Sequence, residues 1–199
     1  MVLPGHLAGG YLMTQILLNL TATSFSSNQT TILLIIGTLA GDGPDIDLIW
    51  YYFENRNSTL SLPKESNDFH RNDKTIASNH REYPTHAPLT WLILCALIVL
   101  AGLITNSIFT VFIGLTILAG SWSHFVLDSI EFGIRWFWPF SNKRYCLHKT
   151  VEIEPAGQKG TFSYYWKMIT TRDFLKSWSL YAEILIVMIA VVVLISEIG

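Results

Sequence analysis

The fold is decided by an apolar hairpin that reads PLTWLILCALIVLAGLITNSIFTVFIGLTILAGSWSHFVLD from Pro88 to Asp128. The polar pair Thr105-Asn106 divides this stretch into two apolar runs, 88–104 and 107–127. A membrane-spanning helix needs about 20 apolar residues, with about 17 as a practical minimum, so each run can be a span. Pro88 suits the first turn of a helix, where its missing N–H leaves no hydrogen bond unmade. The stretch predicts two antiparallel membrane helices joined by a tight turn.

Further apolar runs lie on both sides of this hairpin. Residues 180–198 form the most uniformly apolar run and predict a third span. Residues 7–20 and 32–40 are shorter and enclose the polar stretch 24–31, which predicts a short N-terminal helical hairpin. That hairpin either enters the membrane partway or lies at its interface. We therefore expect an all-α membrane protein of about five helices in a single domain, with three clear spans.

The composition agrees with a membrane protein that carries polar parts. Half of the 199 residues are apolar and 14% are charged, whereas soluble domains average about 25% charged residues. The net charge of −2 gives no basic field for nucleic acid. The two cysteines, Cys95 in an apolar run and Cys146 in a polar loop, provide no disulfide framework.

The distribution of charge predicts an orientation. All 13 Lys and Arg residues lie in two polar regions, 42–87 and 128–178, which the predicted hairpin places on one side of the membrane. The positive-inside tendency makes that side cytoplasmic and puts the C-terminus outside. Within these regions, residues 51–79 form a polar insertion and residues 141–178 form a polar segment before the last span.

The same topology brings four groups of histidines and acids to the cytoplasmic face. Ionisable side chains beside a membrane span need partners or a metal ion. Histidine and carboxylate are ligand types of zinc, manganese and magnesium. The predicted metal ligands are His6, Asp45, Asp47, His80, His86, His124 and Asp128.

Each group has a plainer alternative. His124 and Asp128 are four apart on a helix and can chelate one ion, but alone they also fit a helix end facing solvent. Asp45 and Asp47 are two apart and point the same way in an extended or turn conformation; one of them could instead cap a helix. We favour Asp47 as a bridging ligand and Asp45 as a second ligand or a cap.

The segment from His80 to His86 combines several functional groups. Pro84 favours an extended conformation for the preceding residue, which predicts a shaped loop. Arg81 carries a fork of donors suited to phosphate or carboxylate, and the hydroxyl of Thr85 could orient a ligand. The alternative is a polar loop beside the membrane. His6 gains importance only because the topology brings it to the same face.

The order of these motifs resembles the family of LexA-regulated, inner-membrane metal-dependent hydrolases. The resemblance covers roughly residues 4–148 and rests on short motifs that together are specific: His6 with Gly9 and Gly10, Gly37-Thr38-Leu39-Ala40-Gly41, Pro44-Asp45-Ile46-Asp47, His80-Arg81, Thr85-His86, His124 to Asp128, Gly133 and Trp138-Pro139-Phe140. That family is regarded as distantly similar to zinc-dependent phospholipase C and P1-type nuclease. The resemblance implies an inner-membrane location and direct metal ligands at His6, Asp47, His80 or His86, His124 and Asp128.

We therefore predict a membrane-bound hydrolase that cleaves a phosphoester of a lipid-like or small substrate with metal-activated water. The expected cofactor is one or two divalent ions, zinc first and manganese or magnesium as alternatives. Asp47, Arg81 and Asp128 are the predicted catalytic residues, with Arg81 stabilising charge on the phosphoryl oxygens. The aromatic run 136–140 could line a mouth for an amphiphile. The rival functions are a metal transporter and a non-enzymatic structural or interaction protein.

Overall fold

The computed structural model describes residues 3–21, 23–50, 80–130, 133–147 and 178–198. Within these ranges it contains five α-helices of 16 residues or more and no strand beyond a single bridge between Ile134 and Tyr145. The helices are α1 (Leu3–Thr21), α2 (Ser27–Asp42), α4 (Pro88–Ile104), α5 (Ile108–Asp128) and α7 (Trp178–Ile198). Three short 3-10 turns are η1 (Gly43–Ile46), η2 (His80–Glu82) and η3 (Pro84–His86). The all-α prediction is confirmed for the part of the chain that the structure describes.

The predicted central hairpin forms as α4 and α5. Ser107 caps α5 by accepting a hydrogen bond from the Thr110 N–H, which provides a partner for one of the free donors at the helix start. The turn before it contains Asn106 at a φ of 52°, a left-handed conformation that asparagine tolerates better than most residues. The turn therefore ends α4 at Ile104, after 17 residues.

The prediction of three clear spans is corrected to two candidate spans among the residues that the structure describes. Ile108–Asp128 and Leu180–Glu197 are long and apolar enough to cross a membrane, whereas Pro88–Ile104 is a shorter apolar helix. At 1.5 Å per residue, 17 residues extend about 25 Å, which is less than the hydrocarbon thickness of about 30 Å.

The N-terminal helices are longer than the apolar runs predict. Helix α2 begins at Ser27 because Ser26 and Gln29 form a capping box, in which each side chain bonds the other residue's backbone N–H. Helix α1 likewise starts at Leu3, ahead of the predicted residue 7. The polar residues at the start of α2 therefore belong to the helix, although they were predicted to form a break.

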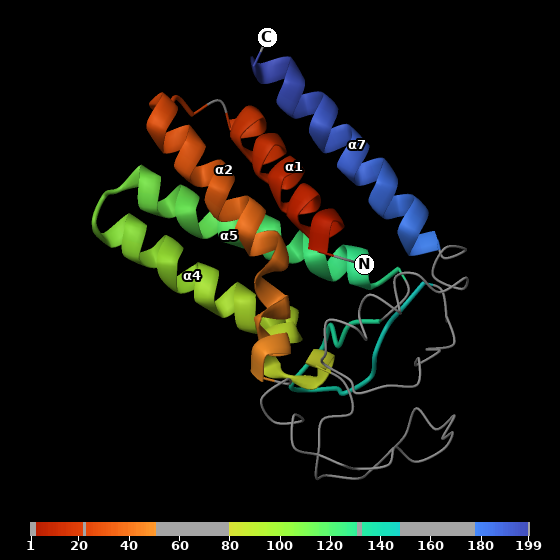
Figure 1. Cartoon of the computed structure of the whole chain (residues 1–199). Helices are drawn as coiled ribbons and strands as arrows, with labels where there is room; N and C mark the ends of the chain where they lie inside the picture. Colours follow the sequence, from red (N-terminus) through yellow and green to blue (C-terminus); the bar gives the residue numbers. More distant parts are fainter. Residues whose placement is uncertain (1–2, 22, 51–79, 131–132, 148–177, 199) are drawn as a thin grey trace, which may run out of the picture.

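Helix α5 lies at the centre of the bundle and packs on α1, α2 and α4, while α7 runs along α1 (Figure 1). Glycines allow close approach where α1, α2 and α5 cross. A methyl group added at Gly10 or at Gly120 would overlap the backbone carbonyl oxygen of Gly37. Small residues of this kind let membrane helices pack backbone to backbone, and they fix the relative positions of the three helices.

Candidate metal centre

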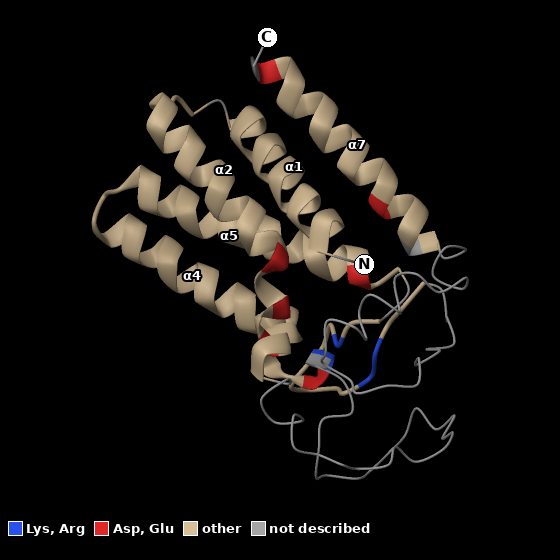
Figure 2. Ribbon diagram, in the orientation of Figure 1, with Lys and Arg blue, Asp and Glu red and all other residues tan. Residues whose placement is uncertain are grey.

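Four segments far apart in sequence meet at one end of the bundle (Figure 1). They are the first turns of α1, the end of α2 with η1, the segment η2–η3 before α4, and the last turn of α5. The acids of α2 and α5 lie at this end, while α1 and α4 contain no charged residue (Figure 2). The side chains brought together are His6, Asp45, Asp47, Arg81, His86, His124 and Asp128. His6, His86, His124 and Asp128 are fully buried.

His86 and His124 face each other through the same ring atom. Their Nε2 atoms lie 3.2 Å apart. The Nδ1 of His124 donates to the carbonyl oxygen of Gly41 at 2.9 Å, and the Nδ1 of His86 donates to Asp47 Oδ2 at 2.8 Å. A neutral imidazole that donates from Nδ1 has a lone pair on Nε2. The anchors thus direct two lone pairs toward one point, where they repel unless a proton or a metal ion lies between them.

Two carboxylates, those of Asp45 and Asp128, also lie close to the Nε2 atoms of both histidines. Asp128 Oδ2 lies 3.5 Å from the Nε2 of His86 and 3.7 Å from that of His124. Asp45 Oδ1 lies 3.8 Å from the Nε2 of each histidine. Four potential donor atoms from η1, η3 and α5 are therefore separated by 3.2 to 3.8 Å over the five measured pairs.

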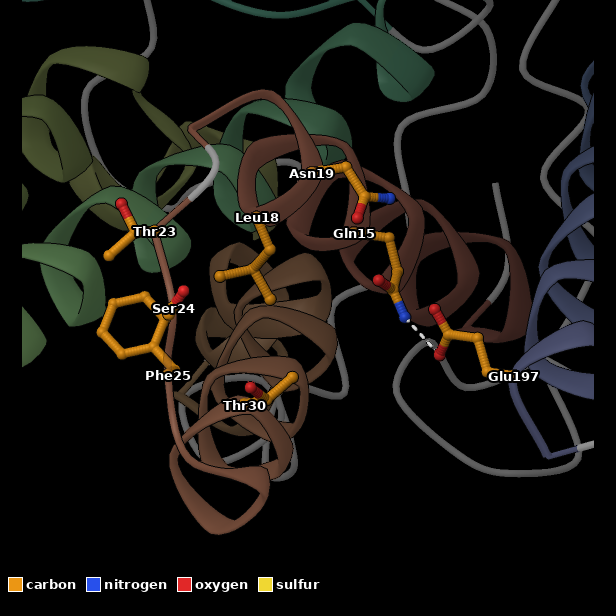
Figure 3. Close-up of a pocket in the computed structure, with 8 residues that line it drawn as sticks. All are labelled: Gln15, Leu18, Asn19, Thr23, Ser24, Phe25, Thr30 and Glu197. Carbon is orange, nitrogen blue, oxygen red and sulfur yellow. Dashed lines mark hydrogen bonds between the residues drawn. The ribbon is translucent and has the colours of Figure 1, made fainter.

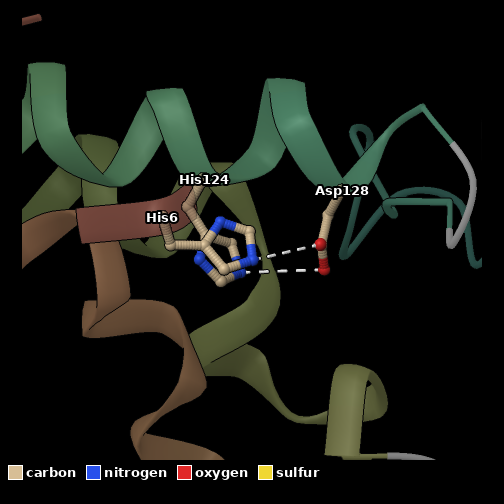
Figure 4. A group of neighbouring side chains, drawn as sticks. All are labelled: His6, His124 and Asp128. Carbon is tan, nitrogen blue, oxygen red and sulfur yellow. Dashed lines mark ion pairs between the residues drawn. The ribbon is translucent and has the colours of Figure 1, made fainter. Parts of the chain in front are cut away.

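His6 lies beside this set (Figure 4). Its ring stacks on that of His124, with centroids 3.9 Å apart, and its Nε2 lies 3.4 Å from Asp128 Oδ1. Both ring nitrogens are buried without a hydrogen bond to any described residue. His6, His124 and Asp128 offer ligand atoms that all lie within 4.8 Å of one another. Asp128 thus presents one oxygen to His6 and the other to His86 and His124.

The two predicted acids Asp45, in η1, and Asp47, directly after it, face different neighbours. Asp45 faces the donor set, whereas Asp47 lies behind His86 and also accepts a hydrogen bond from the Thr85 hydroxyl at 3.0 Å. The cause is the local backbone, because Gly43–Ile46 is a 3-10 turn and not an extended segment. Successive residues of such a turn rotate by about 120°, so side chains two apart diverge. Asp47 is therefore placed to orient His86.

Arg81 and two further arginines hold the segment before α4. Arg81 donates from Nε to Asp128 Oδ2 at 2.6 Å. Arg135 donates to the carbonyl oxygens of Glu82 and Tyr83, and Arg144 pairs with the Glu82 carboxylate at 3.1 Å. Nothing in the spacing of Arg135 and Arg144 marks this role, since both belong to a later, aromatic-rich stretch. His80 is the first residue of η2, and its side chain lies outside those described.

The electrostatics of this end favour a cation. Burial opposes a charge on His86, but hydrogen bonds with Asp128 and Asp47 outweigh it and raise the pKa of the ring. Burial and the nearby Asp45 carboxylate raise the pKa of Asp42 to about 7. The Asp42 carboxyl is thus influenced by the neighbouring Asp45 carboxylate, and a positive ion near Asp45 would relieve that repulsion.

A cavity of about 410 Å³ lies elsewhere, between the far end of α1, the start of α2 and the end of α7 (Figure 3). Its lining includes Gln15, Phe25 and Glu197 and none of the converging histidines. Among the described residues, Glu197 is the one charged side chain in its lining. A functional site is better indicated by several ionisable side chains that converge, so the candidate site is the group of histidines and acids and not this cavity.

The comparison with protein families gives one result. The family model described as YdjM inner membrane protein matches residues 1–198, and the chain belongs to this family. The inner-membrane part of the predicted resemblance is thereby supported. Neither the curated proteins nor the solved structures gave a match, and the distant similarity to phospholipase C and P1 nuclease stays a prediction.

Proposed function

We propose that this member of the YdjM inner membrane protein family is a metal-dependent hydrolase that cleaves a phosphoester of a lipid-like or small substrate. The observation that carries the proposal is the set of four donor atoms from Asp45, His86, His124 and Asp128, in which each carboxylate oxygen lies 3.5 to 3.8 Å from both histidine Nε2 atoms and these lie 3.2 Å apart.

The donor set fits a zinc ion in spacing and chemistry. Ligands about 2.0 to 2.1 Å from a tetrahedral zinc lie about 3.3 Å from each other. The measured separations of 3.2 to 3.8 Å exceed this by at most half an ångström. Two imidazoles and two carboxylates suit zinc, with manganese or magnesium as alternatives. His6, which lies 3.4 Å from Asp128 Oδ1, would hold a second ion together with Asp128.

The hydrogen bonds that His86 and His124 make through Nδ1 also support a metal site. Metal-binding histidines usually donate their other ring N–H to a carboxylate or a backbone carbonyl, which fixes the tautomer and orients the ring. His86 has the carboxylate of Asp47 in this position, and His124 has the carbonyl of Gly41. This arrangement replaces the predicted bridging role of Asp47 with an orienting one in our proposal.

The reaction would draw on a few residues. A bound divalent ion would activate water and polarise a phosphoryl oxygen. Arg81 contributes a guanidinium next to Asp128 and would stabilise negative charge on the phosphoryl oxygens. Asp128 holds Arg81 in place and at the same time faces three histidines.

The surroundings favour a substrate that approaches from the lipid surface. Phe137 and Phe140 lie in the segment that follows α5, and their side chains are 58% and 89% exposed. Trp136 packs on Trp122 of α5 and donates to Ser129, so it contributes to the scaffold and does not line a mouth. Exposed aromatic side chains at a membrane surface bind among lipid head groups, and they would keep the site near an amphiphile. We propose that this surface is cytoplasmic.

Metal content tests the proposal most directly. Detergent-purified wild type should contain nearly stoichiometric zinc or manganese, and His86→Gln and Asp128→Asn should lose it while remaining folded. Glu197→Gln is the matched control, since Glu197 lies at the far cavity. A wild type that stays metal-free after divalent ions are added back would show that His86 and His124 do not hold a divalent ion. That result would remove the hydrolase proposal. Metal that is present in the wild type and lost in the two variants would justify a screen of phosphoester substrates.

A further inference from the structure

Helix α7 carries two acids, and both bond to α1. Glu183 is only 5% exposed although it lies within the candidate span Leu180–Glu197. Glu197 bonds the side chains of Tyr11 and Gln15, which lie further along α1. A carboxylate inside a membrane helix is expensive and usually has a specific partner. The two acids therefore fix how α7 lies along α1.

Glu183 makes a hydrogen bond with the start of α1. Its Oε1 accepts a hydrogen bond from the backbone N–H of Gly5 at 3.1 Å. Gly5 is the third residue of a 19-residue helix, where backbone N–H groups lack partners within the helix and the helix dipole favours a negative charge. A Cβ atom at Gly5 would lie 2.8 Å from Glu183 Cγ. The absence of a side chain at this position is what permits the close contact.

The next residue is His6, whose ring has one polar contact, the 3.4 Å ion pair of its Nε2 with Asp128 Oδ1. His86 and His124 are each oriented by a hydrogen bond from Nδ1. Both nitrogens of His6, in contrast, lack a hydrogen bond to any described residue, and the ring is held by stacking on His124. The position of His6 thus depends on the backbone of the first turns of α1.

We propose that Glu183 is a positioning residue for the candidate metal centre, which it serves by fixing the first turns of α1 and thereby His6. The inference rests on the proposed function for its relevance to metal binding. It assigns a role to α7, which otherwise exposes most of its apolar side chains. Removing a residue that orients a metal ligand typically weakens metal binding by about 10- to 100-fold.

The test compares three variants of the full chain in detergent. Glu183→Leu removes the acceptor, Glu183→Gln retains an oxygen that can accept from Gly5, and Glu197→Leu removes the matched acid at the far end of α7. One readout is the dissociation constant for Zn²⁺ by competition with a chromophoric chelator. The other is the rate at which diethylpyrocarbonate modifies His6 in metal-free protein, followed by mass spectrometry.

The expected pattern is specific to positioning. Glu183→Leu should weaken the binding of the second Zn²⁺, the one that His6 would hold, by about 10-fold or more. It should also expose His6, which is fully buried in the wild type, to faster modification. Glu183→Gln should restore both readouts to near the wild-type values, and Glu197→Leu should leave both unchanged. Equal modification of His6 in wild type and Glu183→Leu would overturn the inference, and so would a failure of glutamine to restore it. A wild type that binds no zinc would remove the proposed function, while the modification rates would still decide the role of Glu183.

Discussion

Gly41 is the position where a single methyl group should separate the helices that build the site. An added Cβ would overlap the carbonyl oxygen of His6 and lie 3.1 Å from the backbone nitrogen of Gly10. Both contacts are backbone atoms of α1, so no side-chain rotation can relieve them. Non-bonded carbon contacts are favourable at about 3.5 to 4.0 Å, so we expect α1 and α2 to move apart by about 1 Å.

Gly41→Ala should therefore affect the site more than the fold. Overpacking of this kind typically costs about 1 to 3 kcal/mol of stability. The same shift moves His6 on α1 and the Gly41 carbonyl that orients His124, and disturbed outer partners weaken metal binding by about 10- to 100-fold.

The assay pairs zinc competition with thermal unfolding in detergent, and Gly114→Ala is the matched control. Its Cβ would lie 2.8 Å from Val99 Cγ2, between α4 and α5. This variant should lose comparable stability and keep its zinc affinity. If Gly41→Ala bound zinc as tightly as the wild type, the proposed dependence of the centre on this helix crossing would be refuted.

Three further predictions concern the loop before α4 and the orientation of the chain. Asp47→Asn removes the carboxylate that sets the tautomer of His86, so its zinc affinity should fall about 10- to 100-fold; an unchanged dissociation constant in the same competition assay would contradict the orienting role. Arg135→Met removes the donors to the carbonyls of residues 82 and 83, so limited trypsin digestion should cleave after Arg81 faster than in the wild type, and equal rates would show that other contacts hold the loop. Cys146 is partly exposed, so an impermeant maleimide should label it in inverted inner-membrane vesicles and not in intact spheroplasts; the opposite pattern would reverse the proposed orientation.

The sequence was sufficient for the helices that are long and uniformly apolar. The bounds of α4 match the predicted run, and α5 differs from its prediction by one residue at each end. The N-terminal helices were predicted too short because apolar content alone hides the capping box of Ser26 and Gln29. Local hydrogen bonds extend α2 over polar residues that hydropathy assigns to a break.

The candidate site, too, could be predicted from the sequence only in part. Its residue types and their shared side of the membrane follow from topology, since segments at the same helix ends must meet. The sequence did not predict that Asp45 and Asp47 diverge, because that depends on η1 adopting a 3-10 turn. Arg135 and Glu183 were missed because they act through backbone groups of other segments. Contacts to a backbone carbonyl or N–H leave no pattern in the partner's sequence.

The burial of the donor atoms has a consequence for rates. His86, His124 and Asp128 have no exposed surface, whereas Asp45 retains 13%. A chelator too large to enter such a site can take an ion only when the protein opens locally. The rate of extraction should then reach a plateau as the chelator concentration rises, and the plateau would equal the opening rate. If the proposed ion is bound, slow exchange of this kind would retain it through purification even where free metal is scarce. Because Asp45 is the donor that keeps exposed surface, ions would then enter and leave on its side.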